Sequence, residues 1–272
     1  MRPNRFIQGS IHGFLRVLEH ALESEELARR NGLLQSLDPR VKLLGILGLI
    51  VAVAASRRLE AIGGVFAVAC VLAVWSQAPL HTLATRVWAG AFAFTGAIAL
   101  PALFLTPGRP IWRLPVFGWA VTAQGLRGAI YLISRVETTA TLSVLLVLCT
   151  PWAHVLKALR VLRVPIVVVV VLGMTYRYIL LTIATVQEMF ESRRSRMVGK
   201  LEGRESRRLA VATAGVLLSK TMQLSGDVYL AMQSRGFRGE VYVLDEFEMR
   251  FRDWSWLILF FALGAAALWV GR

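Results

Sequence analysis

The chain has 272 residues, of which 56% are hydrophobic and only 18% are charged, and its formal net charge is +14. Soluble globular proteins carry about 25% charged residues, so this composition argues against a soluble domain and against a disordered chain. Apolar runs alternate with basic segments, as the positive-inside rule requires of helical membrane proteins. The composition therefore predicts an all-α, polytopic membrane protein, and no nucleic-acid partner is expected.

The N-terminal segment, residues 1–36, is predicted to be cytoplasmic and amphipathic. Leucines from Leu15 to Leu27 recur at helical spacing with charged residues between them. Residues 1–40 contain no apolar stretch typical of a signal peptide. We therefore expect the N-terminus to stay on the cytoplasmic side.

Residues 37–149 are expected to form a four-helix transmembrane part, which begins at Pro39 with Asp38 as the N-cap. Its apolar runs are Val41–Ala55, Leu59–Trp75, Val87–Leu105 and Ala123–Cys149. The segment Thr106–Gly118, rich in Pro, Gly and Trp, fits an external interfacial loop. A fifth apolar run, Trp254–Val270, predicts a final transmembrane helix within residues 254–272.

Residues 150–253 are predicted to be a helical insert of one short and two long helices. Thr150-Pro151 opens the short basic helix, which Pro165 closes. The run Ile166–Leu172 is β-branched and fits a strand or a helix, but the apolar spacing that follows favours one long helix to about Val198. A second long helix follows and ends at Gly236.

Charge predicts the topology of the chain. Residues 1–42 contain 7 Lys and Arg and residues 150–253 contain 16, whereas the two opposite loops contain two each. Basic residues are retained on the cytoplasmic side, so both of these segments are expected there. This arrangement gives five spans with the C-terminus outside, and the helix over 166–189 then lies against the membrane without crossing it.

Each long helix of the insert ends in arginine with small neighbours. The first end reads Ser192-Arg193-Arg194-Ser195-Arg196 and the second reads Ser234-Arg235-Gly236. An arginine at a helix C-terminus can bind the last carbonyls of its own helix. Small neighbours also allow a partner groove to approach the guanidinium, whose planar fork binds carboxylates in a bidentate manner.

Several motifs in this order resemble those of a known family. They are Leu37-Asp38-Pro39-Arg40-Val41-Lys42-Leu43, Tyr176-Arg177-Tyr178, the Arg193 cluster and Ala231-Met232-Gln233-Ser234-Arg235-Gly236-Phe237. The chain resembles the transmembrane T component (EcfT/CbiQ family) of energy-coupling factor (ECF) transporters, and most closely the cobalt-type CbiQ branch. In that family, two long helices of a cytoplasmic coupling domain end in X-Arg-X motifs that dock into two ABC-type ATPases.

The resemblance implies two sets of site residues. The ATPase-docking set is Ser192, Arg193, Arg194, Arg196, Ser234, Arg235 and Gly236, with Arg235 and Arg193 as the docking arginines. The first motif departs from the usual Ala-Arg-Gly, which makes Arg196 an alternative contact. The residues expected to face the substrate-binding S component are Val170, Met174, Leu181, Leu218, Met222 and Tyr229.

The implied function is that of a non-catalytic coupling subunit in a bacterial or archaeal cytoplasmic membrane. Its expected partners are two ABC-type ATPases, which bind ATP and Mg, and a CbiM-like S component with a small accessory subunit. The chain itself has no phosphate-binding Gly-rich loop, and no cofactor is expected in it. The expected cargo is cobalt or nickel, and a shared component for vitamin uptake is the alternative.

Two other hypotheses come from the residues alone. A basic membrane scaffold would use the insert to bind anionic lipids, and an enzyme acting on lipid phosphates would use it as an anion cradle. The enzyme hypothesis lacks an evident nucleophile, base or metal set. No metal site is expected, because the four histidines lack ligand spacing, and Cys70 and Cys149 lie in separate apolar runs.

Two features inside the apolar runs are expected to be structural. Arg127, Tyr131 and Arg135 share one helix face, which favours anchoring of the helix within the bundle. Gly45 and Gly48 are expected to ease the packing of the first span against a neighbour.

Overall fold

The computed structural model describes residues 32–77, 83–106, 110–113, 120–196, 203–237 and 249–272. Contacts within the chain define two compact units. The first, here called the membrane unit, consists of Glu25–Ala158 and Phe247–Arg272, and the second, the α8–α9 unit, contains Leu159–Glu246. The boundaries of the α8–α9 unit, before Leu159 and after Glu246, both fall within the insert expected at residues 150–253.

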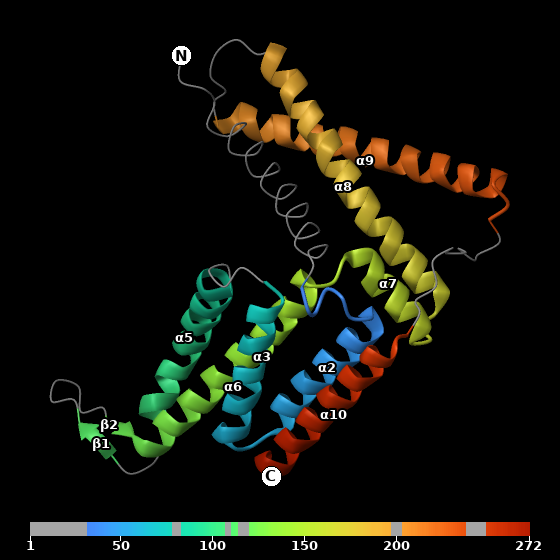
Figure 1. Cartoon of the computed structure of the whole chain (residues 1–272). Helices are drawn as coiled ribbons and strands as arrows, with labels where there is room; N and C mark the ends of the chain where they lie inside the picture. The colour runs from blue at the N-terminus through green and yellow to red at the C-terminus, as the bar shows by residue number, and fades with distance from the viewer. Residues whose placement is uncertain (1–31, 78–82, 107–109, 114–119, 197–202, 238–248) are drawn as a thin grey trace. The chain divides into compact units, whose positions relative to one another are not determined.

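The membrane unit is built almost entirely of helices (Figure 1). They are α2 (Pro39–Ala55), α3 (Leu59–Trp75), the π-helical turn η1 (Leu83–Trp88), α5 (Ala89–Leu105), α6 (Ala123–Leu148) and α10 (Phe251–Gly271). A further helix, α7 (Trp152–Val161), spans the boundary between the two units. The all-α class predicted from the sequence is confirmed.

A loop was predicted between the third and fourth spans, and the structure has a small antiparallel pair of strands there. Strand β1 (Pro110–Arg113) pairs with β2 (Ala120–Thr122), and Thr122 then caps α6 by accepting a hydrogen bond from the Gly125 amide at 3.1 Å. The amphipathic helix expected near the N-terminus lies outside the described residues.

Helix α2 begins as its sequence predicts and lies alongside α10 (Figure 1). The Asp38 carboxylate accepts a hydrogen bond from the Arg40 amide at 2.8 Å, and Pro39 occupies the first helical position. Gly45 faces the ring of Phe260 on α10, so the absence of a side chain allows close packing there. The apolar core around this contact includes Leu49, Val53 and Ala267.

The C-terminal end of α2 is closed by polar groups from α6. The Arg135 guanidinium donates to the backbone carbonyls of Val53, Ala54 and Ser56, and the Tyr131 hydroxyl donates to Ser56 as well. Carbonyls at a helix end need such partners where water is scarce. Arg135 therefore has the structural role expected of it, whereas the Arg127 side chain is exposed.

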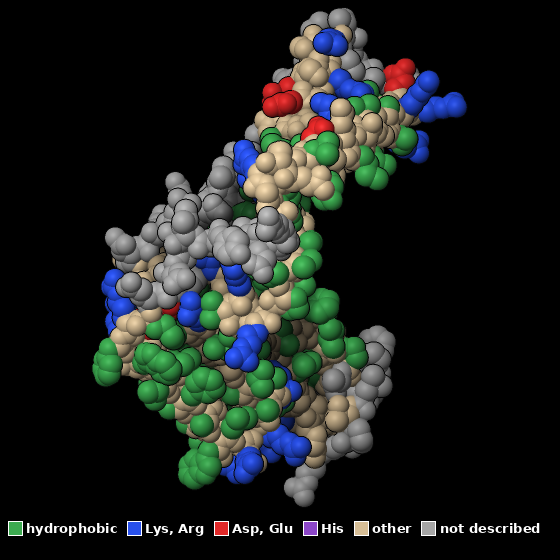
Figure 2. All heavy atoms as spheres, turned by 90° about the vertical axis from the view of Figure 1, so that its right-hand side faces the viewer, with side chains coloured by type: hydrophobic (Ala, Val, Ile, Leu, Met, Phe, Trp, Pro, Cys, Tyr) green, Lys and Arg blue, Asp and Glu red, His purple; other side chains and the backbone are tan. Residues whose placement is uncertain are grey.

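Four helices among the described residues are long and apolar enough to cross a membrane. They are Leu83–Pro101, Ala123–Leu148, Ile166–Arg193 and Phe251–Gly271, and Leu59–Trp75 is a shorter apolar helix. Hydrophobic side chains cover the exposed face of the membrane unit in Figure 2, as expected of a multi-pass membrane protein. By length and composition Ile166–Arg193 also qualifies as a span, so its predicted position along the membrane stays a prediction based on charge.

The close contact at Gly45 generates a test of the α2–α10 packing. A Cβ at Gly45 would lie 2.7 Å from Cγ of Phe260, whereas a Cβ at Gly48 would meet no atom within 4 Å. We expect Gly45→Ala to destabilise the protein by about 1–3 kcal/mol through overpacking. The matched variant Gly48→Ala should be neutral or stabilising, since alanine favours helix over glycine. Thermal unfolding of both variants in detergent measures the difference, and equal midpoints would contradict the packing.

Candidate functional site: the ends and crossing of two long helices

The α8–α9 unit consists of the two long helices predicted for the insert. Helix α8 (Ile166–Arg196) has 31 residues and α9 (Gly203–Ser234) has 32. The β-branched run at the start of α8 is helical, as predicted. With a rise of 1.5 Å per residue, each helix is about 45–50 Å long.

The second arginine motif forms a helix cap made by the backbone. Gly236 has φ +76°, and its amide donates to the Gln233 carbonyl at 2.9 Å while the Phe237 amide donates to the Met232 carbonyl at 3.0 Å. These two bonds are those of a Schellman motif, in which backbone amides satisfy two of the last four carbonyls of the helix. The Arg235 side chain is exposed and is not needed as the cap.

The first arginine motif lies on the last two turns of α8. The hydroxyls of Ser192 and Ser195 donate to carbonyls three residues earlier in the same helix, Met189 at 3.0 Å and Ser192 at 2.9 Å. Arg193 is half-buried and Arg196 is exposed. Arg194 belongs to α8, but its side chain lies outside the described part. Both serine hydroxyls are thus bonded within the helix, and Arg196 is the exposed arginine of this motif among those whose side chains are described.

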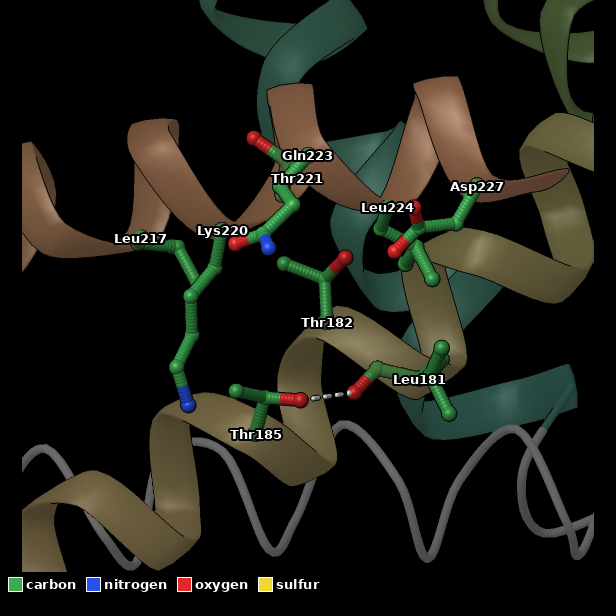
Figure 3. Close-up of a pocket in the computed structure, with 9 residues that line it drawn as sticks. All are labelled: Leu181, Thr182, Thr185, Leu217, Lys220, Thr221, Gln223, Leu224 and Asp227. Atoms are coloured by element: carbon green, nitrogen blue, oxygen red, sulfur yellow. Dashed lines mark hydrogen bonds between the residues drawn. The ribbon is translucent and has the colours of Figure 1, made fainter. Parts of the chain in front are cut away.

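A hollow of about 290 Å³ lies where α8 and α9 cross (Figure 3). Its polar lining includes Thr182 and Thr185 from α8 and Lys220 and Asp227 from α9. In Figure 3 the Lys220 side chain reaches towards the turn of α8 that carries Thr185. The Thr185 hydroxyl donates to the Leu181 carbonyl at 3.0 Å. Its proton is therefore already bonded within α8.

A larger hollow of about 470 Å³ adjoins the first at the same crossing and is more apolar. It is lined by Val171, Met174, Thr175, Tyr178, Thr182, Thr221, Leu224, Ser225, Val228, Tyr229 and Met232. The two hollows share Thr182, Thr221 and Leu224, which are therefore the residues at the crossing itself.

The residues expected to face the S component separate into two groups. Met174 and Tyr229 line the larger hollow, and Leu181 lines the smaller one. Leu218 and Met222 line neither hollow, and they are 64% and 70% exposed on α9. Val170 is half-buried on α8 and also lines neither. The structure thus brings three of the six to the crossing.

The polar residues of the crossing were missed by the sequence analysis. Leu218 and Met222 line neither hollow, whereas their neighbours Leu217 and Thr221, together with Leu224, line the smaller one. The spacing of Leu217, Thr221 and Leu224, at intervals of four and three, is the signal that would have revealed this face.

Comparison with known proteins shows the family of the chain. A family model for CbiQ, described as cobalt transport protein, matches residues 30–243. An uncharacterized protein of Methanocaldococcus jannaschii is 32% identical over 260 residues, which cover 94% of this chain and 88% of the relative. The chain belongs to the CbiQ family, and its role is therefore that of a membrane component in transport.

The Schellman cap of α9 generates the second test. An added Cβ meets no atom within 4 Å at either Gly236 or Gly226, but only Gly236 has a positive φ. We expect Gly236→Ala to weaken the cap by about 1 kcal/mol, which corresponds to roughly fivefold faster hydrogen exchange of the Phe237 amide. Gly226→Ala, in the middle of α9, should leave that exchange unchanged. Exchange followed by mass spectrometry compares the two, and an equal response would contradict the role of the cap.

Proposed function

We propose that this chain is the coupling subunit of an ECF-type ABC importer, in which Arg235 and an arginine of the first motif dock into two ATPase subunits. The observation that carries the proposal is the end of α9. The Gln233 and Met232 carbonyls accept from the amides of Gly236 and Phe237, and the Arg235 side chain is exposed, so its guanidinium is available to a carboxylate of another protein. Membership of the CbiQ family supports the same assignment.

The proposed mechanism is mechanical. Closure of the ATPase pair changes the separation of its two grooves, and each groove holds the end of one long helix. A helix of about 45–50 Å is stiff enough to pass that displacement along its length. At the crossing, the apolar hollow around Met174 and Tyr229 is the surface through which the S component is shifted.

Cobalt is the proposed cargo, because the family model is described as cobalt transport protein. Nickel shares the preference for nitrogen and oxygen ligands and is the alternative within the same branch. The chain has no group of three or more His, Cys, Asp or Glu placed to hold a metal ion among its described residues. The metal ligands are therefore proposed to belong to the S component, and ATP and Mg to the ATPases.

The direct test is substitution of Arg235. We expect Arg235→Ala to weaken co-purification of the ATPases roughly 30-fold, as the loss of a central charged contact does at an interface, and to abolish ATP-dependent uptake of labelled cobalt. Insertion of the chain should be unaffected, because the guanidinium does not cap α9. Arg204→Ala is the matched control, since it removes an exposed arginine at the opposite end of the same helix.

Uptake that is unchanged in Arg235→Ala would refute the assignment. The pair Arg193→Ala and Arg196→Ala identifies the docking arginine of the first motif, because only the docking residue should reproduce the loss. If the wild-type chain is purified without any ATPase under conditions that preserve other membrane complexes, the lipid-scaffold hypothesis is favoured instead.

A further inference from the structure

Lys42 is a buried cation that the docking mechanism does not use. Only 1% of its surface is exposed, and its Nζ donates to the carbonyl oxygen of Cys149 at 3.2 Å. A buried charge is costly unless it is paired. Two carboxylates, those of Asp38 and Asp253, are also buried, and Asp253 accepts a hydrogen bond from the Asp38 amide.

The Cys149 carbonyl lies at the C-terminal end of α6. Cys149 is the C-cap of this helix, and its amide donates to the Leu145 carbonyl at 3.0 Å. The next helix, α7, begins at Trp152, and the membrane unit ends within it at Ala158. Lys42 therefore ties the start of α2 to the end of α6, which α7 follows on the way to α8.

The point where the chain returns is tied to the same part of α2. One oxygen of Asp253 accepts from the Asp38 amide at 3.1 Å, and the other accepts from the Arg250 amide at 3.0 Å. Next to it, the Arg252 guanidinium donates to the Ser36 carbonyl at 2.8 Å. Here the segment Ser36–Lys42 is called the anchor segment, since it holds both the end of α6 at Cys149 and the start of α10.

We propose that Lys42 is a positioning residue for transport: together with Asp253, it fixes two points to one anchor segment, the end of α6, which leads through α7 to α8, and the start of α10, where the chain returns. With only one of these ties, the end of α6 or the start of α10 is free to move relative to α2, whereas with both ties the two points keep one position within the membrane unit. Displacement of α8 and α9 is then transmitted to α2 and α10. This inference rests on the proposed coupling function.

The first experiment measures coupling in the assembled transporter. Lys42→Met keeps the side-chain length and removes the hydrogen bond to Cys149, and the double variant Lys42→Met with Asp253→Asn also removes the negative charge of the side chain that accepts from the Asp38 and Arg250 amides. We expect ATP hydrolysis per assembled complex to stay within about twofold, and cobalt uptake per ATP to fall about tenfold, within the usual range of couplings between sites.

Lys157→Met is the matched control, because it removes the ammonium of a half-buried lysine on α7 and leaves the anchor segment intact. Its uptake per ATP should equal that of the wild type. If cobalt uptake per ATP hydrolysed stays at the wild-type value in both Lys42 variants, the positioning role is overturned. A parallel fall of hydrolysis and uptake is one form of this result.

A second measurement does not depend on the ATPases. Spin labels at positions 51 on α2 and 153 on α7 occupy exposed sites of the membrane unit, in a chain whose Cys70 and Cys149 are replaced by alanine. We expect the distance distribution between the labels to broaden in the double variant and to stay narrow with Lys157→Met. An unchanged distribution overturns the anchor. If no ATPase binds the wild-type chain, the proposed coupling function is refuted. The distance distribution still shows whether Lys42 and Asp253 hold α7 in place relative to α2.

Discussion

Helix ends in an apolar surrounding must find hydrogen-bond partners, because little water is available to satisfy their free amides and carbonyls. In the membrane unit, both ends of α2 obtain these partners from other helices. Arg135 of α6 binds the carbonyls at the C-terminal end. Asp253 of α10 binds the Asp38 amide at the N-terminal end. Polar groups thus fix the ends of α2, and the contact of Gly45 with Phe260 fixes its middle.

Signals that act over a few residues were sufficient to predict most of the helices. Asp38 followed by Pro39 marks the start of α2, and Gly236 marks the end of α9, because each requirement is local to the backbone there. The β-branched start of α8 was predicted as helix from the spacing of the residues that follow it. The run Ile166–Leu172 alone is short enough for a strand, so the helical spacing beyond it decided the prediction.

Contacts between distant residues could not be predicted in the same way. Lys42 was visible only as a basic residue near a membrane boundary, and its acceptor is the carbonyl of Cys149, 107 positions away. Main-chain carbonyls carry no sequence signal. The partners of Arg135 are also main-chain carbonyls, so its face was predictable but its acceptors were not. On α9, Tyr229 lines the larger hollow as expected, but Leu218 and Met222 are exposed, because leucines at helical spacing occur on more than one face of this helix.

The distance along the chain between α2 and α10 has a consequence for synthesis. Asp38 and Asp253 are 215 positions apart, so the ribosome completes α2 long before α10 exists. During that interval Gly45 and its neighbours lack their contact with Phe260 of α10, and the Asp38 amide lacks its acceptor, the Asp253 carboxylate. Non-local pairings of this kind are slow to form. Maturation of the membrane unit is therefore delayed until the last helix inserts.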